Sequence, residues 1–178
     1  MRSPAGISRT TVQRALQSAA LAAAVAVLAT GCGSGTVQRV APGVDQSKTS
    51  TGADGTDWST QARNVDLSIK NAVVQLGAAG SARLDFTVDN AGPVTEHLAV
   101  VSVPGMGQAT LQGSTGPANA LSTAGIMIDS GSSAVFGAGS PSVVLPSAKG
   151  LTPGGTTPVL LEFGIAGLVH LTVPVKAA

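Results

Sequence analysis

The stretch SARLDFTVDN, Ser81–Asn90, decides the fold class of this chain. Its apolar residues stand at every second position, separated by Arg, Asp or Thr: Ala82, Leu84, Phe86 and Val88. Successive side chains of a β-strand point to opposite faces of the sheet. A period of two therefore predicts a strand with one buried face and one solvated face.

The same period continues on both sides of this stretch. NVDLSIKNAVV, from Asn64 onward, places Val65, Leu67 and Ile69 on one face. Further short apolar segments follow, separated by turn-forming Gly, Pro, Asn and Ser: HLAVVSV, QATLQG, IMID, SAVFG, SVVLP, TPVLLEFG and LVHLTVPV. No segment in this region has a helical period. We therefore predict an all-β domain over residues 63–178, a single antiparallel β-sandwich of about seven to nine strands with Pro174 in an edge strand.

The first 31 residues have the pattern of a signal peptide. Three arginines, Arg2, Arg9 and Arg14, precede the apolar run AALAAAVAVLA at Ala19–Ala29, and no acidic residue lies among them. A membrane-spanning helix needs about 20 apolar residues, so this run is too short to span a bilayer. We predict that residues 1–31 direct export and are then removed.

Cys32 is the only cysteine of the chain, and it follows this run directly in VLATGCGSG, residues 27–35. The segment resembles a bacterial lipobox, although Ala29 stands where a leucine is usual. The resemblance implies cleavage between Gly31 and Cys32 and a diacylglycerol group, with palmitate-type acyl chains, on Cys32. Two acyl chains anchor a protein stably where one does not. The expected location is the outer face of the cytoplasmic membrane or the cell envelope; the alternative is an exported protein with a free, buried thiol.

Residues 32–62 read as a flexible tether behind this anchor. The segment from Gly33 to Ala62 is rich in Gly, Ser, Thr and Asp and shows no periodic apolar pattern. Such a composition buries too little apolar surface to offset the entropy of ordering. Trp58 is the one large apolar side chain here. We expect it to pack on the edge of the domain, in preference to a role as a partner-binding anchor.

The charge of the exported chain argues against nucleic-acid binding. The whole chain carries 10 Lys and Arg against 9 Asp and Glu, and three of the basic residues leave with the signal. Seven basic residues then face nine acidic ones, and the chain contains no tyrosine. Nucleic-acid binding sites combine basic patches with aromatic side chains that stack on bases. We expect no nucleic-acid partner.

Catalytic motifs do not stand out in the chain, so we predict that it is not an enzyme. The sequence has two histidines and no G-x-S-x-G or phosphate-binding glycine motif. His170, within LVHLTV, is expected to be an ordinary sheet histidine. His97 follows Glu96, and the pair is expected to lie at the surface. No Cys and His cluster has the spacing of a zinc site.

A copper(I) site remains an open alternative on the residues alone. Thioether and imidazole donors suit this soft ion. Met106 and Met127 are the methionines left after signal removal, and His97 or His170 could complete a site with them. Packing roles explain both methionines equally well, so the primary expectation is that the chain has no metal site.

Three segments in order resemble the periplasmic copper-chaperone domain family called PCuAC: VDLSIKNAVV, ARLDFTVDNAGPVTEHLAVVSVPGMGQATLQGS and GLTPGGTTPVLLEFGIAGLVHLTVPV. The similarity covers roughly residues 64–175 and is strongest to the branch found in actinobacterial lipoproteins of the LpqE type. The most specific portion is the ending, with its Leu-x-Pro-Gly-Gly turn and closing Val-Pro-Val. The resemblance implies a cupredoxin-like, immunoglobulin-like β-sandwich.

The resemblance also locates the family's copper ligands. Copper-binding members use His and Met, including a His-x-Met pair ahead of the Leu-x-Pro-Gly-Gly turn. These places fall on Gln112, Ser142 and Val144, and the family methionine falls near Leu121–Ala124, where no methionine stands. The resemblance therefore implies the family fold without its copper ligands, and we expect no resident cofactor.

Two functions follow from these observations. The first is a lipid-anchored, noncatalytic envelope module that binds or scaffolds an unknown exported or envelope protein. The alternative is a carrier of copper or another metal that uses a site different from the family's.

Overall fold

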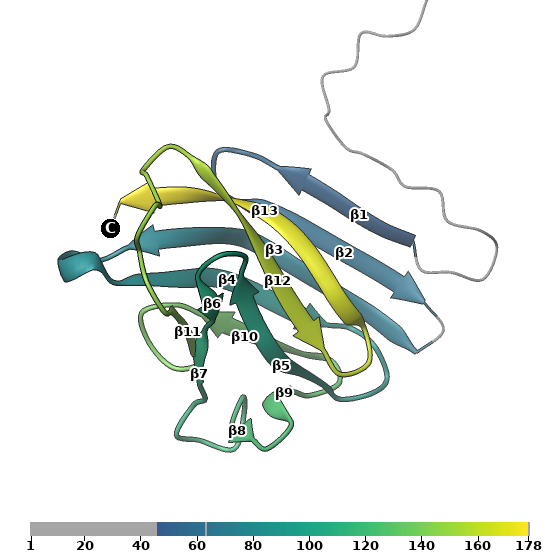
Figure 1. Ribbon diagram of the computed structural model, residues 1–178. Helices are drawn as coiled ribbons and strands as arrows, with labels where there is room; N and C mark the ends of the chain where they lie inside the picture. Colours follow the sequence, from purple (N-terminus) through teal and green to yellow (C-terminus); the bar gives the residue numbers. More distant parts are fainter. Residues whose placement is uncertain (1–45, 63, 178) are drawn as a thin grey trace, which may run out of the picture. The chain divides into compact units, whose positions relative to one another are not determined.

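The computed structural model describes residues 46–62 and 64–177 (Figure 1), and in these ranges the chain is all-β. Thirteen strands and one short 3₁₀ turn, Ala78–Gly80, account for its regular structure, with no α-helix among the described residues. The strands are β1 (Gln46–Thr51), β2 (Thr56–Ala62), β3 (Val65–Leu76), β4 (Ala82–Asn90), β5 (Glu96–Val103), β6 (Gly107–Gln108), β7 (Thr110–Gln112), β8 (Leu121–Ser122), β9 (Gly125–Ile128), β10 (Ser132–Phe136), β11 (Ser142–Leu145), β12 (Thr156–Phe163) and β13 (Gly167–Ala177).

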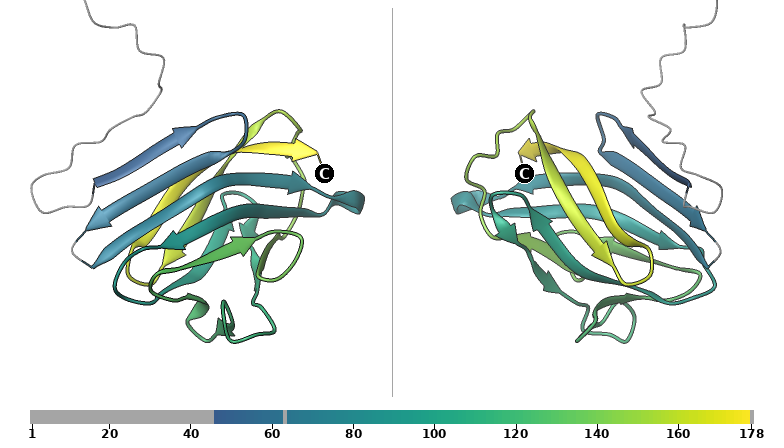
Figure 2. Two further views of the ribbon diagram at one scale, coloured as in Figure 1. Left: turned by 180° about the vertical axis from the view of Figure 1, so that it is seen from behind. Right: turned by 45° about the vertical axis from the view of Figure 1, so that its right-hand side comes forward.

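The strands form two layers that share one core. In the first layer β1 pairs with β2, β2 with β3 and β3 with β4; β10 and β11 pair with β4, and β7 pairs with β11. In the second layer the order is β13, β12, β5, β9 and β8, with β6 on β5. Figures 1 and 2 show β12 and β13 lying across one face of the layer that β2, β3 and β4 form. This is the predicted β-sandwich.

Strand β13 belongs to both layers. Its residues from Gly167 to Pro174 pair with β12, and Val175 to Ala177 pair in parallel with β3. Every other pairing in the described sheet is antiparallel. The sequence predicts an edge position for Pro174; in the structure it stands where β13 changes partner, a place that suits a residue without an N–H to donate.

The buried residues of the core follow the predicted alternation. In β4 every second residue from Ala82 to Asn90 is buried. The rings of Phe86 and Phe136 stack with their centroids 4.4 Å apart. The core cluster runs in sequence from Trp58 to Val175. The fragment from Ser34 to Ala178 therefore contains the whole of this core and every described strand.

The predicted boundary between tether and domain at residue 63 is wrong. Residues 46–62 form β1 and β2, which continue the first layer beyond β3. Thr56, Trp58 and Thr60 are buried on the inner face of β2. Threonine is β-branched and fits a pleated surface, and the Thr56 hydroxyl donates to the carbonyl of Thr172 at 2.6 Å. The rest of the predicted tether, 32–45, lies outside the described residues.

The predicted signal peptide, the cleavage position at Gly31 and the lipidation site at Cys32 also lie outside the described residues. Within the described ranges, no helix has the length and apolar character needed to cross a membrane.

Candidate functional site

Two of the places where the family resemblance expects copper ligands lie directly opposite each other. Strands β7 and β11 pair antiparallel, with Gln112 facing Ser142. The Ser142 hydroxyl is buried and donates a hydrogen bond of 3.0 Å to Oε1 of Gln112. Val144 stands two residues further along β11, on the same face, and is exposed.

The third expected region lies against the same strand pair. A Cβ built on Gly113, the residue after Gln112, would be 2.2 Å from the backbone nitrogen of Leu121. The backbone at the start of β8 is therefore packed against the end of β7, and the side chains of Leu121–Ala124 are exposed. All the places that the resemblance indicates converge in this fold.

The residues at these places do not fit copper(I). That ion prefers thiolate, thioether and imidazole donors. Gln112 offers a carboxamide, Ser142 a hydroxyl and Val144 no donor atom. The hydroxyl and the amide oxygen are also bonded to each other. The chemistry of this donor set gives no reason for a soft metal ion to bind here.

Comparisons with solved structures return PCuAC domains. The apo PCuAC domain from PmoF1 matches with a TM-score of 0.51 at 20% identity, covering 63% of this chain and 94% of that one. The copper-bound PCuAC domain from PmoF2 matches with a TM-score of 0.51 at 19% identity, covering 63% and 93%. The fold is PCuAC-like. This confirms the predicted cupredoxin-like sandwich; no family model and no curated protein matches the sequence.

A different pair of soft donors is brought together by the sheet. His97 on β5 and Met127 on β9 are register partners in an antiparallel pairing, and both are half-buried. Directly opposed side chains lie on one face, with Cβ atoms about 5 Å apart. The His97 ring packs on Gly164, where an added Cβ would lie 2.0 Å from Cε1. Only a glycine at 164 leaves room for the imidazole in this position.

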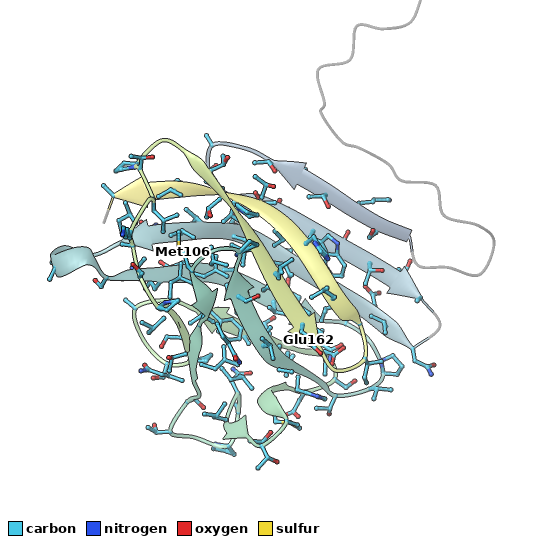
Figure 3. All side chains as sticks on the ribbon, in the orientation of Figure 1. Met106 and Glu162 are labelled. Carbon is cyan, nitrogen blue, oxygen red and sulfur yellow. The ribbon has the colours of Figure 1, made fainter. Side chains whose placement is uncertain are left out.

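The other predicted soft donors are not part of this pair. Met106 follows the far end of β5 and packs against the core. The six steps along the strand from His97 to Val103 span about 20 Å. Figure 3 shows Met106 well away from Glu162, whose end of β12 pairs with the His97 end of β5. His170 is exposed on β13 opposite Leu160, as expected of a sheet histidine. The described residues contain no group of three or more His, Cys, Asp or Glu side chains able to hold a metal.

Glu96 is a structural carboxylate that the sequence analysis misplaced. It is 3% exposed, so the predicted Glu–His surface pair is wrong. Its Oε1 accepts from the backbone N–H groups of His97 at 2.8 Å and Ile165 at 3.0 Å, and its Oε2 accepts from Ala166 at 2.7 Å. The carboxylate therefore holds the β12–β13 turn against the start of β5. Glu96 stands two residues before the buried Leu98 in β5, so the alternation of the strand places both on the inner face, and this alternation is the sequence signal for its burial.

Proposed function

We propose that this chain is a lipid-anchored cell-envelope protein whose PCuAC-like β-sandwich is a noncatalytic binding or scaffold module. The observation that carries the proposal is the hydrogen bond between Ser142 and Gln112. It occupies the place where copper-binding members of the resembled family carry soft donors. A domain that keeps this fold but has a hydroxyl and an amide in that place has lost the chemistry for carrying copper there.

The anchor rests on the sequence around Cys32. An apolar run behind three arginines ends in small residues directly before the single cysteine. An exported protein with one cysteine cannot form an internal disulfide, and lipidation gives that cysteine a role. The module would then act at the outer face of the membrane, on a partner that is itself exported or exposed in the envelope.

Mass spectrometry of the N-terminus of the mature protein tests the anchor. We expect Cys32 to be the first residue and to carry a diacylglyceryl group. In the Cys32→Ala variant, we expect acylation to be lost and the protein to remain unprocessed or to be released. An unmodified Cys32 at the mature N-terminus would refute the lipid anchor.

Copper titration tests the absence of carrier chemistry. The fragment Ser34–Ala178 is titrated with Cu(I) against a competing chelator. We expect no submicromolar binding. Submicromolar binding that Gln112→Ala and Ser142→Ala abolish would show that this pair does serve copper and would overturn the proposal.

A second candidate function, a carrier of copper or another soft metal at a non-family site, is favoured by one observation. His97 and Met127 face each other across β5 and β9, which puts an imidazole and a thioether on one sheet face. In that case copper would be cargo held by these two side chains. The titration distinguishes the candidates: submicromolar binding lost in His97→Ala and Met127→Leu but kept in Met106→Leu would establish the carrier.

A further inference from the structure

A groove lies between the first layer and strand β13. It has a volume of about 290 Å³. Four side chains from β1 and β2 line one wall, and residues from the β12–β13 turn and β13 line the other: Ser47, Thr49, Trp58 and Thr60, then Ala166, Leu168, Val169 and His170. This groove is separate from the places of the family ligands on β7 and β11 and from the His97–Met127 pair.

One buried hydroxyl in the groove wall has no hydrogen-bond partner among the described residues. Thr60 is 5% exposed, and its Oγ1 is the side-chain atom left unsatisfied among the buried polar atoms of residues 46–62 and 64–177. Buried polar groups in folded proteins are almost always hydrogen-bonded. An unpaired hydroxyl next to an open groove is therefore a mark of a group that a ligand completes.

The edge of β13 supplies backbone groups to the same groove. The carbonyl of Thr172 accepts from Thr56 on β2 and so faces away from β12. Its register partner on β12 is Pro158, which has no N–H to give. The N–H and C=O groups of an antiparallel strand alternate between its two sides. Leu168 and His170, in phase with Thr172, thus direct their backbone groups to the side of the groove, where β13 pairs with no described strand before Val175.

The lining favours an uncharged chain that offers backbone donors and acceptors. None of the eight lining residues is Asp, Glu, Lys or Arg. Hydroxyls from Ser47, Thr49 and Thr60 can each donate or accept. Leu168, 56% exposed, and Trp58 provide apolar contact. Backbone groups two residues apart along an open strand edge match the repeat of an extended peptide.

We propose that this groove binds an extended, uncharged peptide segment of a partner protein as an additional strand along β13. The peptide pairs with the backbone of Leu168 and His170, and one of its polar groups completes the Thr60 hydroxyl. The inference rests on the proposed binding function and identifies the class of partner that the module would take.

Trp58, the single tryptophan of the chain, reports binding directly. A phage-displayed library of random heptapeptides is selected on the fragment Ser34–Ala178, and the enriched peptides are synthesised and titrated by Trp58 fluorescence. Thr60→Val removes the unpaired hydroxyl at constant shape, and Ser50→Ala, on the opposite face of β1, is the matched control. We expect Thr60→Val to weaken binding at least threefold without lowering the thermal midpoint, and Ser50→Ala to bind as the parent does.

His170→Pro removes the backbone donor that faces the groove and leaves the pairing with β12 intact. We expect at least tenfold weaker binding, and an equal loss when the peptide is N-methylated at alternate amides. A selection that enriches no peptide over a blank surface would overturn the inference. So would peptides that bind equally to Thr60→Val and tolerate N-methylation. A partner that crosslinks elsewhere on the sandwich in cells would overturn this site while the proposed binding function stands.

Discussion

Removal of the Glu96 carboxylate should destabilise the domain strongly. The group is buried and accepts hydrogen bonds from three backbone N–H groups, of which those of Ile165 and Ala166 belong to the β12–β13 turn. The Ile165 N–H is shared between the two carboxylate oxygens, at 3.0 and 3.2 Å, so its bond is left out of the sum. The other two bonds to a charged acceptor contribute about 1.5 kcal/mol each at the low end of their range, so Glu96→Ala should cost about 3 kcal/mol.

Equilibrium unfolding in urea, followed by Trp58 fluorescence and circular dichroism, measures this loss. With a slope of about 2 kcal/mol per molar urea, the midpoint should fall by about 1.5 M. Glu162→Ala is the control, because this carboxylate lies exposed on β12 beside the same turn. Its effect should stay within about 0.5 kcal/mol. A loss below about 1 kcal/mol for Glu96→Ala, or equal losses for the two variants, would refute the role assigned to the buried carboxylate.

Three further predictions concern other parts of the sandwich. The Lys70 ammonium, by its hydrogen bond, and the Ser133 hydroxyl hold the pKa of Asp89 below its usual range. Ionised Asp89 therefore stabilises the fold at neutral pH, and this stabilisation is lost as pH falls through the lowered pKa. The difference in unfolding free energy between the parent and Asp89→Asn should vanish on strong acidification. Urea titrations at several pH values measure this difference. Gly125 has φ +117°, and an added Cβ would lie 2.1 Å from the Leu98 carbonyl oxygen, so Gly125→Ala should lower the thermal midpoint by at least about 5 °C. The triple substitution Q112H, S142H and V144M puts His and Met donors where the resemblance expects the family's copper ligands. It should create Cu(I) binding in a chelator competition, and no gain in binding would argue against the proposed loss of these ligands.

Side-chain periodicity predicted most of the sheet. The alternation in Ser81–Asn90 and in the segment from Val65 became β4 and β3, which pair with each other. The turn residues between the shorter segments separated the later strands as expected. Trp58 packs against the domain, as preferred, but as a buried core residue of β2 and not at the domain edge.

The first two strands escaped prediction because their buried face is partly polar. Thr56 and Thr60 occupy inward positions that a pattern of apolar residues does not detect. The hydroxyl of Thr56 is satisfied by a carbonyl that lies 116 residues later in the chain. Such a partner is known only once the fold brings β13 beside β2.

The candidate sites, like the strands, could be predicted only in part from the sequence. The family resemblance predicts which residues stand at the copper-ligand places, but the hydrogen bond between Gln112 and Ser142 depends on the register of β7 with β11. The facing of His97 and Met127 likewise depends on the register of β5 with β9. A shift of one residue in either pairing would send these side chains to opposite faces, and the sequence alone does not fix the register.

The sheet-switching strand β13 also bears on when the domain acquires its structure. It is the last of the described strands in sequence, and it alone among them is hydrogen-bonded to both layers. Until β13 is in place, β12 lacks one neighbour and β3 lacks the end of another, so the sandwich cannot close. Closure of the two layers therefore depends on contacts between residues about 100 positions apart in sequence, such as Val175 with Val74, and such non-local pairings slow the folding of a β-sandwich.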